Sequence, residues 1–353
     1  MLATFQLQDF KGHRDTEVPL GRFTMLVGDN GSGKTSVLEA LWLQGAIPPN
    51  PPTVLNGDWY PDDLLRRGAT GPIQLSSEGK RGEAVWKSKI AIAVSATDWR
   101  LTASISNPSG RSNVEATGNR GGGSASGEWP SFGALIGRAE LYRLQANRIA
   151  AAAYSGRPDT VIDPDGTQTA VVLAQLKLGD DEVYERIEAS MRRLVPSLER
   201  VRIRPARIPE TGALGNKISF DFRGAAGVPA HGASHGTLIV LALLTVLHGP
   251  QRPQLVLLDD FDHALHPRAQ VELVRMIKEL LNEFEDLQIA ATTHSPYILD
   301  ELDPSDVHAF ALRDDGTVAG KRLSEHPDAQ KTKGSLTAGQ LWSLDRERDW
   351  VLG

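Results

Sequence analysis

The chain of 353 residues contains no cysteine, which excludes disulfide bonds, zinc–thiolate sites, iron–sulfur clusters and thiol nucleophiles together. It also has no run of about 18 apolar residues, the length that a membrane helix needs, so we expect no membrane partner. Residues 1–6 lack a basic start followed by an apolar stretch and therefore predict no secretory signal. These absences favour a cytoplasmic globular protein.

A net positive charge is absent too. The 38 lysines and arginines are outnumbered by 44 aspartates and glutamates, which gives a formal net charge of -6. This balance argues against a protein whose whole surface binds nucleic acid, although a local basic strip stays open. The apolar content of 40% and the charged content of 23% are ordinary for a globular protein, so the composition excludes global disorder.

The order of patterns along the chain predicts an α/β fold. Residues 1–49 have the pattern of strands, a glycine loop and a helix, and residues 53–135 alternate polar and apolar side chains as antiparallel strands do. Residues 136–230 mix short helices with strands. Residues 231–353 contain an almost wholly apolar helix and two continuous apolar strands, which are typical of a central parallel sheet. We therefore expect a single domain over residues 1–353, made of an N-terminal lobe, a β-rich insertion, a middle segment and a C-terminal lobe in this order.

The segment Gly28–Thr35, GDNGSGKT, matches the phosphate-binding pattern G-x-x-x-x-G-K-[ST] without a mismatch and lies between an apolar strand and a helix. Glycines let successive backbone N–H groups point at phosphate oxygens, and the helix start adds its positive dipole end. Lys34 would reach the β- and γ-phosphates, and the Thr35 hydroxyl would bind Mg²⁺. The sequence therefore predicts an ATP and Mg²⁺ site whose cofactor-binding residues are Asn30, Gly31, Ser32, Gly33, Lys34, Thr35 and Ser36.

Two apolar strands further along the chain end in side chains suited to hydrolysis. Leu255–Leu258 is followed by Asp259 and Asp260, and a buried parallel strand delivers such carboxylates to the ligand-binding edge of an α/β sheet. We assign Asp259 to Mg²⁺ and Asp260 to orienting the attacking water. His294 follows the strand 287–291 at the same edge, where it can hydrogen-bond a phosphate oxygen or the water. Asp260 and His294 are thus the predicted catalytic residues.

A fourth motif, Gly232–Gly236, precedes the apolar helix. Ser234 is a good N-cap, and a helix start with Gly236 presents free N–H groups to an anion. Capping alone would explain Ser234. The functional alternative is that this helix end binds the γ-phosphate of a nucleotide held by another subunit.

These motifs, in this order, resemble those of the ABC-type ATPase heads of the SMC, RecF and OLD (overcoming lysogenisation defect) group, and most of all the compact OLD-like predicted ATPases of the AAA family without a Toprim domain. The matching segments are Gly28–Thr35 with the Walker A motif, Ser234–Gly236 with the signature motif, Leu255–Asp260 with Walker B, Leu265–Pro267 with the D-loop, and Thr293–Pro296 with the switch histidine. Leu7–His13 also resembles the first strand and turn of the OLD-like branch. The resemblance covers residues 1–45 and 231–312 well and the middle of the chain loosely.

The resemblance implies a P-loop NTPase fold of the ABC/SMC-head type, with a mixed central sheet, flanking helices and an antiparallel β subdomain. It implies a homodimer with two ATP molecules in composite sites, each built from Ser234 and Gly236 of one subunit and the glycine loop of the other. It also implies a glutamine at the end of a middle strand, for which Gln145 is the candidate. Most relatives have glutamate where Asp260 stands, so the shorter carboxylate suggests slow turnover.

The sequence shows no sustained heptads, which excludes long SMC-type arms, and few residues follow the last predicted strands, so we expect any nuclease to be a separate chain. We expect a slowly hydrolysing dimeric ATPase that couples ATP-driven dimerisation to DNA or to a partner effector, such as a nuclease or toxin, in phage defence or genome maintenance. The alternatives are an ATP-locked scaffold or sensor with little turnover, and a RecF-like recombination mediator. The candidate DNA surface, which an ordinary solvated strand face also explains, is the arginine strip of Arg192, Arg193, Arg200, Arg202, Arg204 and Arg207.

Overall fold

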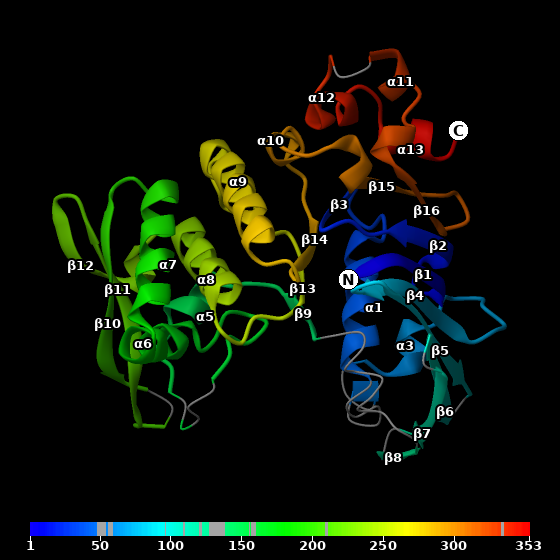
Figure 1. Cartoon of the computed structure of the whole chain (residues 1–353), viewed down its shortest axis with the longest axis horizontal. Helices are drawn as coiled ribbons and strands as arrows, with labels where there is room; N and C mark the ends of the chain where they lie inside the picture. The colour runs from blue at the N-terminus through cyan, green and yellow to red at the C-terminus, as the bar shows by residue number, and fades with distance from the viewer. Residues whose placement is uncertain are drawn as a thin grey trace. The chain divides into compact units, whose positions relative to one another are not determined.

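The computed structural model describes residues 1–47, 54–55, 59–95, 97–108, 110–119, 122–126, 138–154, 156, 160–208, 211–332 and 335–353. The chain divides into two compact units (Figure 1). Unit 1 comprises Met1–Leu141, Pro253–Asp259 and Glu285–Gly353, and unit 2 comprises Tyr142–Arg252 and Asp260–Phe284. The chain therefore passes between the units after residues 141, 252, 259 and 284. The predicted segment boundaries at residues 49, 53, 135 and 136 lie outside the described residues.

Unit 1 contains a mixed six-stranded sheet with the strand order β16-β15-β3-β14-β13-β9. Its strands are β3 (Phe23–Gly28), β9 (Ala139–Tyr142), β13 (Leu255–Leu258), β14 (Gln288–Thr292), β15 (Val307–Leu312) and β16 (Val318–Arg322). β3 pairs in parallel with β14 and β15, and β13 pairs in parallel with β14, whereas β16 is antiparallel to β15. All residues of β3, β13 and β14 are buried, as their continuous apolar sequences predict. The carboxyl ends of these three strands therefore lie at one edge of the sheet.

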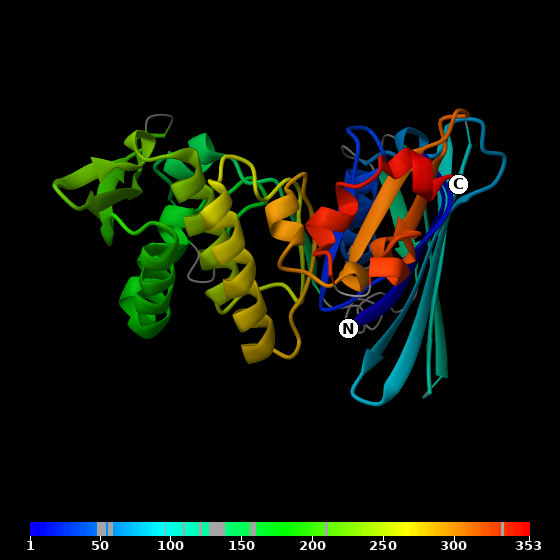
Figure 2. The same cartoon turned by 90° about the horizontal axis from the view of Figure 1, so that it is seen from above.

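Unit 1 also contains an antiparallel seven-stranded sheet with the order β2-β1-β4-β5-β6-β7-β8. Its strands are β1 (Leu2–Phe10), β2 (His13–Pro19), β4 (Ile73–Arg81), β5 (Ala84–Val94), β6 (Asp98–Asn107), β7 (Gly110–Asn119) and β8 (Gly122–Ser126). Figure 2 shows the long strands of this sheet side-on, in cyan. Ile90 and Ile92 of β5 are buried, while Lys87 and Lys89 on the same strand are exposed. The predicted antiparallel subdomain is confirmed, and the sheet also takes in β1 and β2 from the start of the chain.

Helix α1 (Lys34–Ala46) packs against strands of both sheets, namely β1 of the seven-stranded sheet and β3, β13 and β14 of the six-stranded one. Its buried residues, which include Val37 and Leu41, lie on more than one side of the helix because both sheets cover it. Near its end, the buried Gln44 amide donates to the Ser88 hydroxyl at 2.6 Å and also to the Ser77 hydroxyl. These hydrogen bonds attach the C-terminal end of α1 to β4 and β5 of the seven-stranded sheet.

Unit 2 is built from helices and a small antiparallel sheet of order β10-β11-β12. Its elements are α5 (Ala146–Ala150), α6 (Thr169–Gly179), α7 (Asp181–Leu194), β10 (Leu198–Arg207), β11 (Leu214–Phe222), β12 (Ala225–Pro229), α8 (His235–His248) and α9 (Pro267–Glu283). The Asp180 side chain caps α7 by accepting the Val183 N–H at 3.3 Å. α8 is buried along most of its length, in agreement with its apolar sequence. Pro267 stands in the first turn of α9, where its missing N–H is not needed.

Short helices complete unit 1. They are α3 (Pro61–Leu64), α10 (Pro296–Leu299), α11 (Ala329–Thr332), α12 (Ala338–Trp342) and α13 (Glu347–Val351). Within the described part of the chain, no helix has the length and apolar character needed to cross a membrane. The predicted α/β fold, with a mixed central sheet, flanking helices and an antiparallel subdomain, is confirmed.

Candidate functional site

Glycine is required at both ends of the loop between β3 and α1. Gly28 has a φ of 141°, and a β-carbon there would lie 2.3 Å from the Phe310 carbonyl oxygen. Gly33, with a φ of 95°, is the N-cap of α1, and a β-carbon there would approach His13 Nε2 and Val318 Cγ2 to 2.8 Å each. Both positions combine a positive φ with a close approach that only glycine tolerates. The loop therefore lies tightly against β2, β15 and β16.

Lys34 lies inside this loop and is only 5% exposed. Its Nζ donates to the carbonyl oxygens of Gly28 at 2.7 Å and of Asp29 at 2.9 Å. Ser32 is 1% exposed, and its Oγ is a buried polar atom without a hydrogen-bond partner in the described structure. A desolvated ammonium and an unpaired hydroxyl, held by a glycine loop at a helix start, fit the donors that a phosphate group needs.

The residues predicted to bind Mg²⁺ are hydrogen-bonded to each other. Thr35 Oγ1 donates to Asp259 Oδ1 at 3.0 Å, and Thr292 Oγ1 donates to the same oxygen at 2.9 Å. The two hydroxyls therefore fix the orientation of the Asp259 carboxylate, and hydroxyl and carboxylate oxygens are the ligands that Mg²⁺ prefers. The sequence did not indicate that Thr292 belongs to this site. Thr292 lies beside Asp259 because the parallel register of β13 and β14 pairs Leu258 with Ala291, and that register is visible only in the structure.

The predicted catalytic residues follow two neighbouring parallel strands, and both are exposed. Asp260 comes directly after Asp259 with a φ of 49°, a left-handed conformation that aspartate tolerates better than most residues. Its carbonyl oxygen accepts the His263 N–H at 3.1 Å and closes a turn. The Thr293 hydroxyl accepts the Ser295 N–H at 3.0 Å. This hydrogen bond spans His294 and restrains the backbone that carries its imidazole.

In unit 2, the Ser234 hydroxyl caps α8 by accepting the Thr237 N–H at 3.1 Å, and it also hydrogen-bonds Thr237 Oγ1 at 2.7 Å. Gly236, in the first turn of the helix, packs closely against the loop before α9. A β-carbon at residue 236 would lie 2.7 Å from the Ala264 carbonyl oxygen and 2.9 Å from Leu265 Cδ2. The segments with signature-like and D-loop-like sequences are therefore in contact, and glycine permits that contact.

Gln145 is exposed and is the N-cap residue of α5, three residues after β9. Its backbone N–H donates to the Asp165 carbonyl oxygen at 2.9 Å. Of the other predicted residues, Asn30 and Gly31 are exposed at the tip of the glycine loop, and Ser36 is half-buried. Unit 1 contains Asn30, Gly31, Ser32, Gly33, Lys34, Thr35, Ser36, Asp259 and His294, and unit 2 contains Gln145, Ser234, Gly236 and Asp260.

His13 is a contact of the glycine loop whose role was not predicted. It is fully buried on β2, with Nε2 at 3.1 Å from the Gly33 carbonyl oxygen and Nδ1 at 3.0 Å from Thr16 Oγ1. Burial lowers the pKa of His13 to about 4, against the opposing effect of the Gly33 carbonyl. The imidazole is therefore neutral at pH 7, and a carbonyl partner requires Nε2 to carry the proton while Nδ1 accepts from Thr16. Apart from its place at the end of the Leu7–His13 segment, no local sequence signal marks this histidine.

Fewer arginines of the predicted strip carry an unmatched charge in the structure than the sequence suggested. Arg192 pairs with Glu188, Arg202 pairs with Asp221, and Arg193 forms ion pairs with two glutamates of α9. The hydrogen bond from Arg202 lowers the pKa of the Asp221 carboxyl. Among the described residues, three of the six arginines thus have their charge matched by an acid, which makes the strip a weaker DNA surface.

Two family models match the sequence. A model described as "AAA ATPase domain" matches residues 1–44, and one described as "AAA domain, putative AbiEii toxin, Type IV TA system" matches residues 133–300. The first range contains the glycine loop, and the second contains Asp259, Asp260 and His294.

Solved structures of Smc head domains share the fold. An Smc head bound to the C-winged helix domain of ScpA superposes with a TM-score of 0.58 at 15% identity, covering 94% of this chain and 99% of that one. An Smc head domain with an extended coiled coil, bound to the C-terminal domain of ScpA and derived from Pyrococcus furiosus, superposes with a TM-score of 0.54 at 14% identity, covering 95% of this chain and 98% of that one. The expected resemblance is thereby confirmed: the chain has the fold of an ABC/SMC-type ATPase head and matches models of AAA ATPase domains.

Proposed function

We propose that the chain binds ATP with Mg²⁺ at the Gly28–Thr35 loop and hydrolyses the ATP slowly. The observation that carries this proposal is the hydrogen-bonded group of Thr35, Asp259 and Thr292, because it joins a hydroxyl of the loop to a carboxylate from a separate strand. The matches to AAA ATPase domain models support it. When bound, Mg²⁺ would neutralise charge on the β- and γ-phosphate oxygens.

The loop supplies the donors for the phosphates. Lys34 Nζ is held by two neutral carbonyl oxygens, and a phosphate oxygen is a stronger acceptor because it is charged. We therefore expect Nζ to exchange these carbonyls for phosphate oxygens on binding. Burial of Lys34 strengthens that interaction, since the ammonium is already largely desolvated. The Ser32 hydroxyl and the backbone N–H groups at the start of α1 would take further phosphate oxygens.

Hydrolysis would depend on Asp260 and His294. Asp260 would accept a hydrogen bond from the attacking water, and His294 would bind the terminal phosphate or the same water. Aspartate reaches one methylene less far than a glutamate would, so the water would be held less closely. Slow turnover is the expected consequence.

We further propose that two copies of the chain form composite sites, in which the α8 start at Ser234 and Gly236 meets the nucleotide of the other copy. A helix start leaves its first N–H groups without an intrahelical partner, and those at the start of α8 are proposed to meet the phosphate. The Ser234 hydroxyl occupies one of them by accepting the Thr237 N–H. Gln145, exposed at the start of α5, would reach the bound metal or water.

The output is proposed to be a separate effector held or released by this dimer. The solved Smc heads that share the fold are bound to domains of ScpA, and one matching family model carries a toxin–antitoxin description. The first favours a protein partner over DNA, and the second favours a partner of the toxin kind. DNA is less favoured also because acids already match part of the charge of the arginine strip.

Two variants test the ATPase. Lys34→Ala is expected to weaken ATP binding by about tenfold or more, since it removes a charge-assisted contact to phosphate. Lys80→Ala, at an exposed lysine of the same unit, is the matched control and should bind ATP as the wild type does. Calorimetric titration measures both affinities. Undiminished ATP affinity in Lys34→Ala would contradict the assignment of the loop.

Asp260→Asn is expected to bind ATP and to lose turnover, which would trap the ATP-bound dimer. Equal turnover of this variant and the wild type would place the catalytic carboxylate elsewhere. The short side chain of Asp260 also favours a second candidate function, an ATP-locked scaffold with little turnover. That alternative predicts that a co-purifying effector stays bound to both proteins after ATP addition, whereas the coupled ATPase predicts release from the wild type alone.

A further inference from the structure

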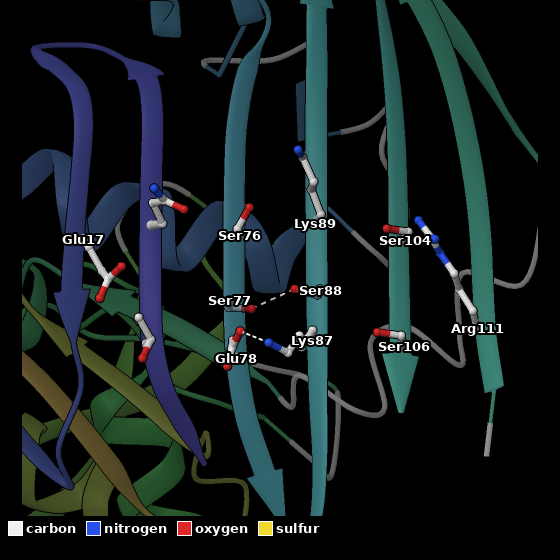
Figure 3. A pocket seen from close by; sticks show the side chains of 12 residues that line it. Glu17, Ser76, Ser77, Glu78, Lys87, Ser88, Lys89, Ser104, Ser106 and Arg111 are labelled. Atoms are coloured by element: carbon white, nitrogen blue, oxygen red, sulfur yellow. Dashed lines mark hydrogen bonds and ion pairs between the residues drawn. The ribbon is translucent and has the colours of Figure 1, made fainter. Parts of the chain in front are cut away.

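The outer face of the seven-stranded sheet has a hollow of about 380 Å³ that extends from β2 and β1 over β4, β5 and β6 to β7 (Figure 3). The register explains it. Lys89 of β5 lies opposite Ser104 of β6, and one pair further along Lys87 lies opposite Ser106, which in turn lies opposite Arg111 of β7. Short serine side chains on β6 therefore lie beside the long lysine side chains of β5, and Ser106 also lies beside Arg111. This part of the hollow lies between the two lysines and Arg111, and the lining continues over β4 and β1 to Glu17 of β2.

The charges around this hollow are only partly matched. Lys87 forms an ion pair with Glu78, which is its cross-strand neighbour on β4. Lys89 and Arg111 are exposed, and neither has an ion pair or side-chain hydrogen bond within the described residues. In Figure 3 the Arg111 side chain extends toward Ser104 on the neighbouring strand. Two unmatched cations therefore stand beside a row of serine hydroxyls.

We propose that this hollow binds a phosphate monoester, as a free compound or on a side chain of a partner. A guanidinium donates two parallel hydrogen bonds to a phosphate, an ammonium adds a compact charge, and the hydroxyls of Ser76, Ser104 and Ser106 supply further donors. The volume is at the small end of the range of ligand pockets and suits one phosphorylated group.

The arrangement of charge favours a single phosphate over a nucleic acid. The cationic rows span two cross-strand pairs, which is about 7 Å along the strands. Glu17 on β2 and Glu78 on β4 line the hollow, and Glu115 follows Arg111 on the exposed face of β7. A nucleic-acid backbone requires a longer basic strip, since its charges repeat along the whole strand.

The experiment titrates inorganic phosphate, and separately a peptide with one phosphoserine, into the Lys34→Ala protein, in which phosphate binding at the glycine loop is weakened. The same background carrying Lys89→Gln and Arg111→Gln removes the two unmatched cations. The matched control is Arg100→Gln in that background, because Arg100 is an exposed cation on the same face of β6 outside the hollow. Because the substituted side chains are exposed and unpaired, the variants should keep the wild-type unfolding temperature, which is checked first.

We expect saturable phosphate binding that weakens by about tenfold or more in the Lys89→Gln, Arg111→Gln protein and is unchanged in the Arg100→Gln protein. Tighter binding of the phosphopeptide than of phosphate identifies a modified partner as the source, and equal binding identifies a free compound. Equal affinities in all three proteins, or no saturable binding of either probe at millimolar concentration, would overturn the proposal. A DNA duplex that binds through Lys89 and Arg111 while both probes fail would overturn it as well.

Discussion

Replacing His13 by phenylalanine removes two hydrogen bonds at the glycine loop while roughly preserving the volume of the ring. The wild-type imidazole lies 3.1 Å from the Gly33 carbonyl oxygen and 3.0 Å from Thr16 Oγ1. Thr16 is 4% exposed, so its hydroxyl would lose a buried partner, which costs about 1–3 kcal/mol of the free energy of unfolding. The Gly33 carbonyl loses less, because it still accepts the Val37 N–H at 3.2 Å.

The same substitution should also weaken ATP binding, because Gly33 is the N-cap of α1 and sets the loop geometry. Loss of one hydrogen bond worth about 1 kcal/mol corresponds to about a fivefold weaker affinity. His13→Gln is the matched control, since its amide N–H can still donate to the Gly33 oxygen while the contact to Thr16 is lost. We expect the affinity for ATP, measured by calorimetric titration, to fall in His13→Phe and to be restored in His13→Gln. Identical affinities for ATP in wild type and His13→Phe would refute the positioning role of His13.

The pH dependence of stability gives an independent measurement. Burial lowers the pKa of His13 from 6.5 in the unfolded chain to about 4 in the folded one, so the folded state loses stability as the pH falls from about 6.5 to about 4. A difference of about 2.5 pKa units corresponds to about 3 kcal/mol. His13→Gln does not titrate, and its free energy of urea unfolding should therefore fall less steeply in this interval. The pKa of His308 is lowered by burial to about 4 as well. Because both proteins contain His308, its contribution to the pH dependence is the same in both and drops out of the comparison. If the free energy of unfolding of the two proteins fell equally steeply between pH 6.5 and pH 4, the lowered pKa of His13 would be refuted.

Substitutions at three positions probe the rest of the site. Thr292→Val removes one of two hydroxyls on Asp259 and should raise the Mg²⁺ concentration for half-maximal ATPase activity by about fivefold; an unchanged Mg²⁺ dependence would show that Thr35 alone orients the carboxylate. Ser234→Arg should leave ATP binding by a single subunit intact and abolish ATP-dependent dimerisation in light scattering, and normal dimerisation would contradict the composite site. Asp260→Gly should resist urea better than Asp260→Ala by about 1 kcal/mol, because a φ of 49° favours glycine, while both variants lose turnover. Equal resistance of the two would mean that the backbone relaxes once the aspartate is replaced.

The strands around the glycine loop could be predicted because each has a strong local signal. Leu255–Leu258 is continuously apolar since both faces of a central parallel strand are covered, and polar residues appear directly where burial ends. The same reasoning located Asp259 and His294 at the edge of the sheet. The loop itself follows from its motif, since the pattern of glycine, lysine and threonine reflects the backbone geometry seen at Gly28 and Gly33.

Pairings between distant segments could not be predicted in this way. The pairing of β1 with β4 places Leu7 opposite Leu75, yet both strands alternate in the same manner as any half-buried strand, and nothing local specifies the partner. The contact of His13 with Gly33 depends on that same long-range assembly. The passage of the chain between units after residues 141, 252, 259 and 284 also lacks a compositional sign. These features depend on which surfaces pack together rather than on the residues of one segment.

The junction at Asp259 and Asp260 joins the proposed metal site to the segment that carries the proposed dimer surface. Asp259 is held by two hydroxyls in unit 1, and Asp260, one peptide or about 3.8 Å along the chain, begins unit 2. From Asp260 the chain makes a turn to His263, and the loop that follows packs against Gly236 at the start of α8. Within unit 2, the left-handed Asp260 and the close approach at Gly236 therefore leave the segment between them little conformational freedom. The same helix start is proposed to meet the nucleotide of the other copy, so the proposed catalytic Asp260 and the proposed dimer surface belong to one closely packed part of unit 2.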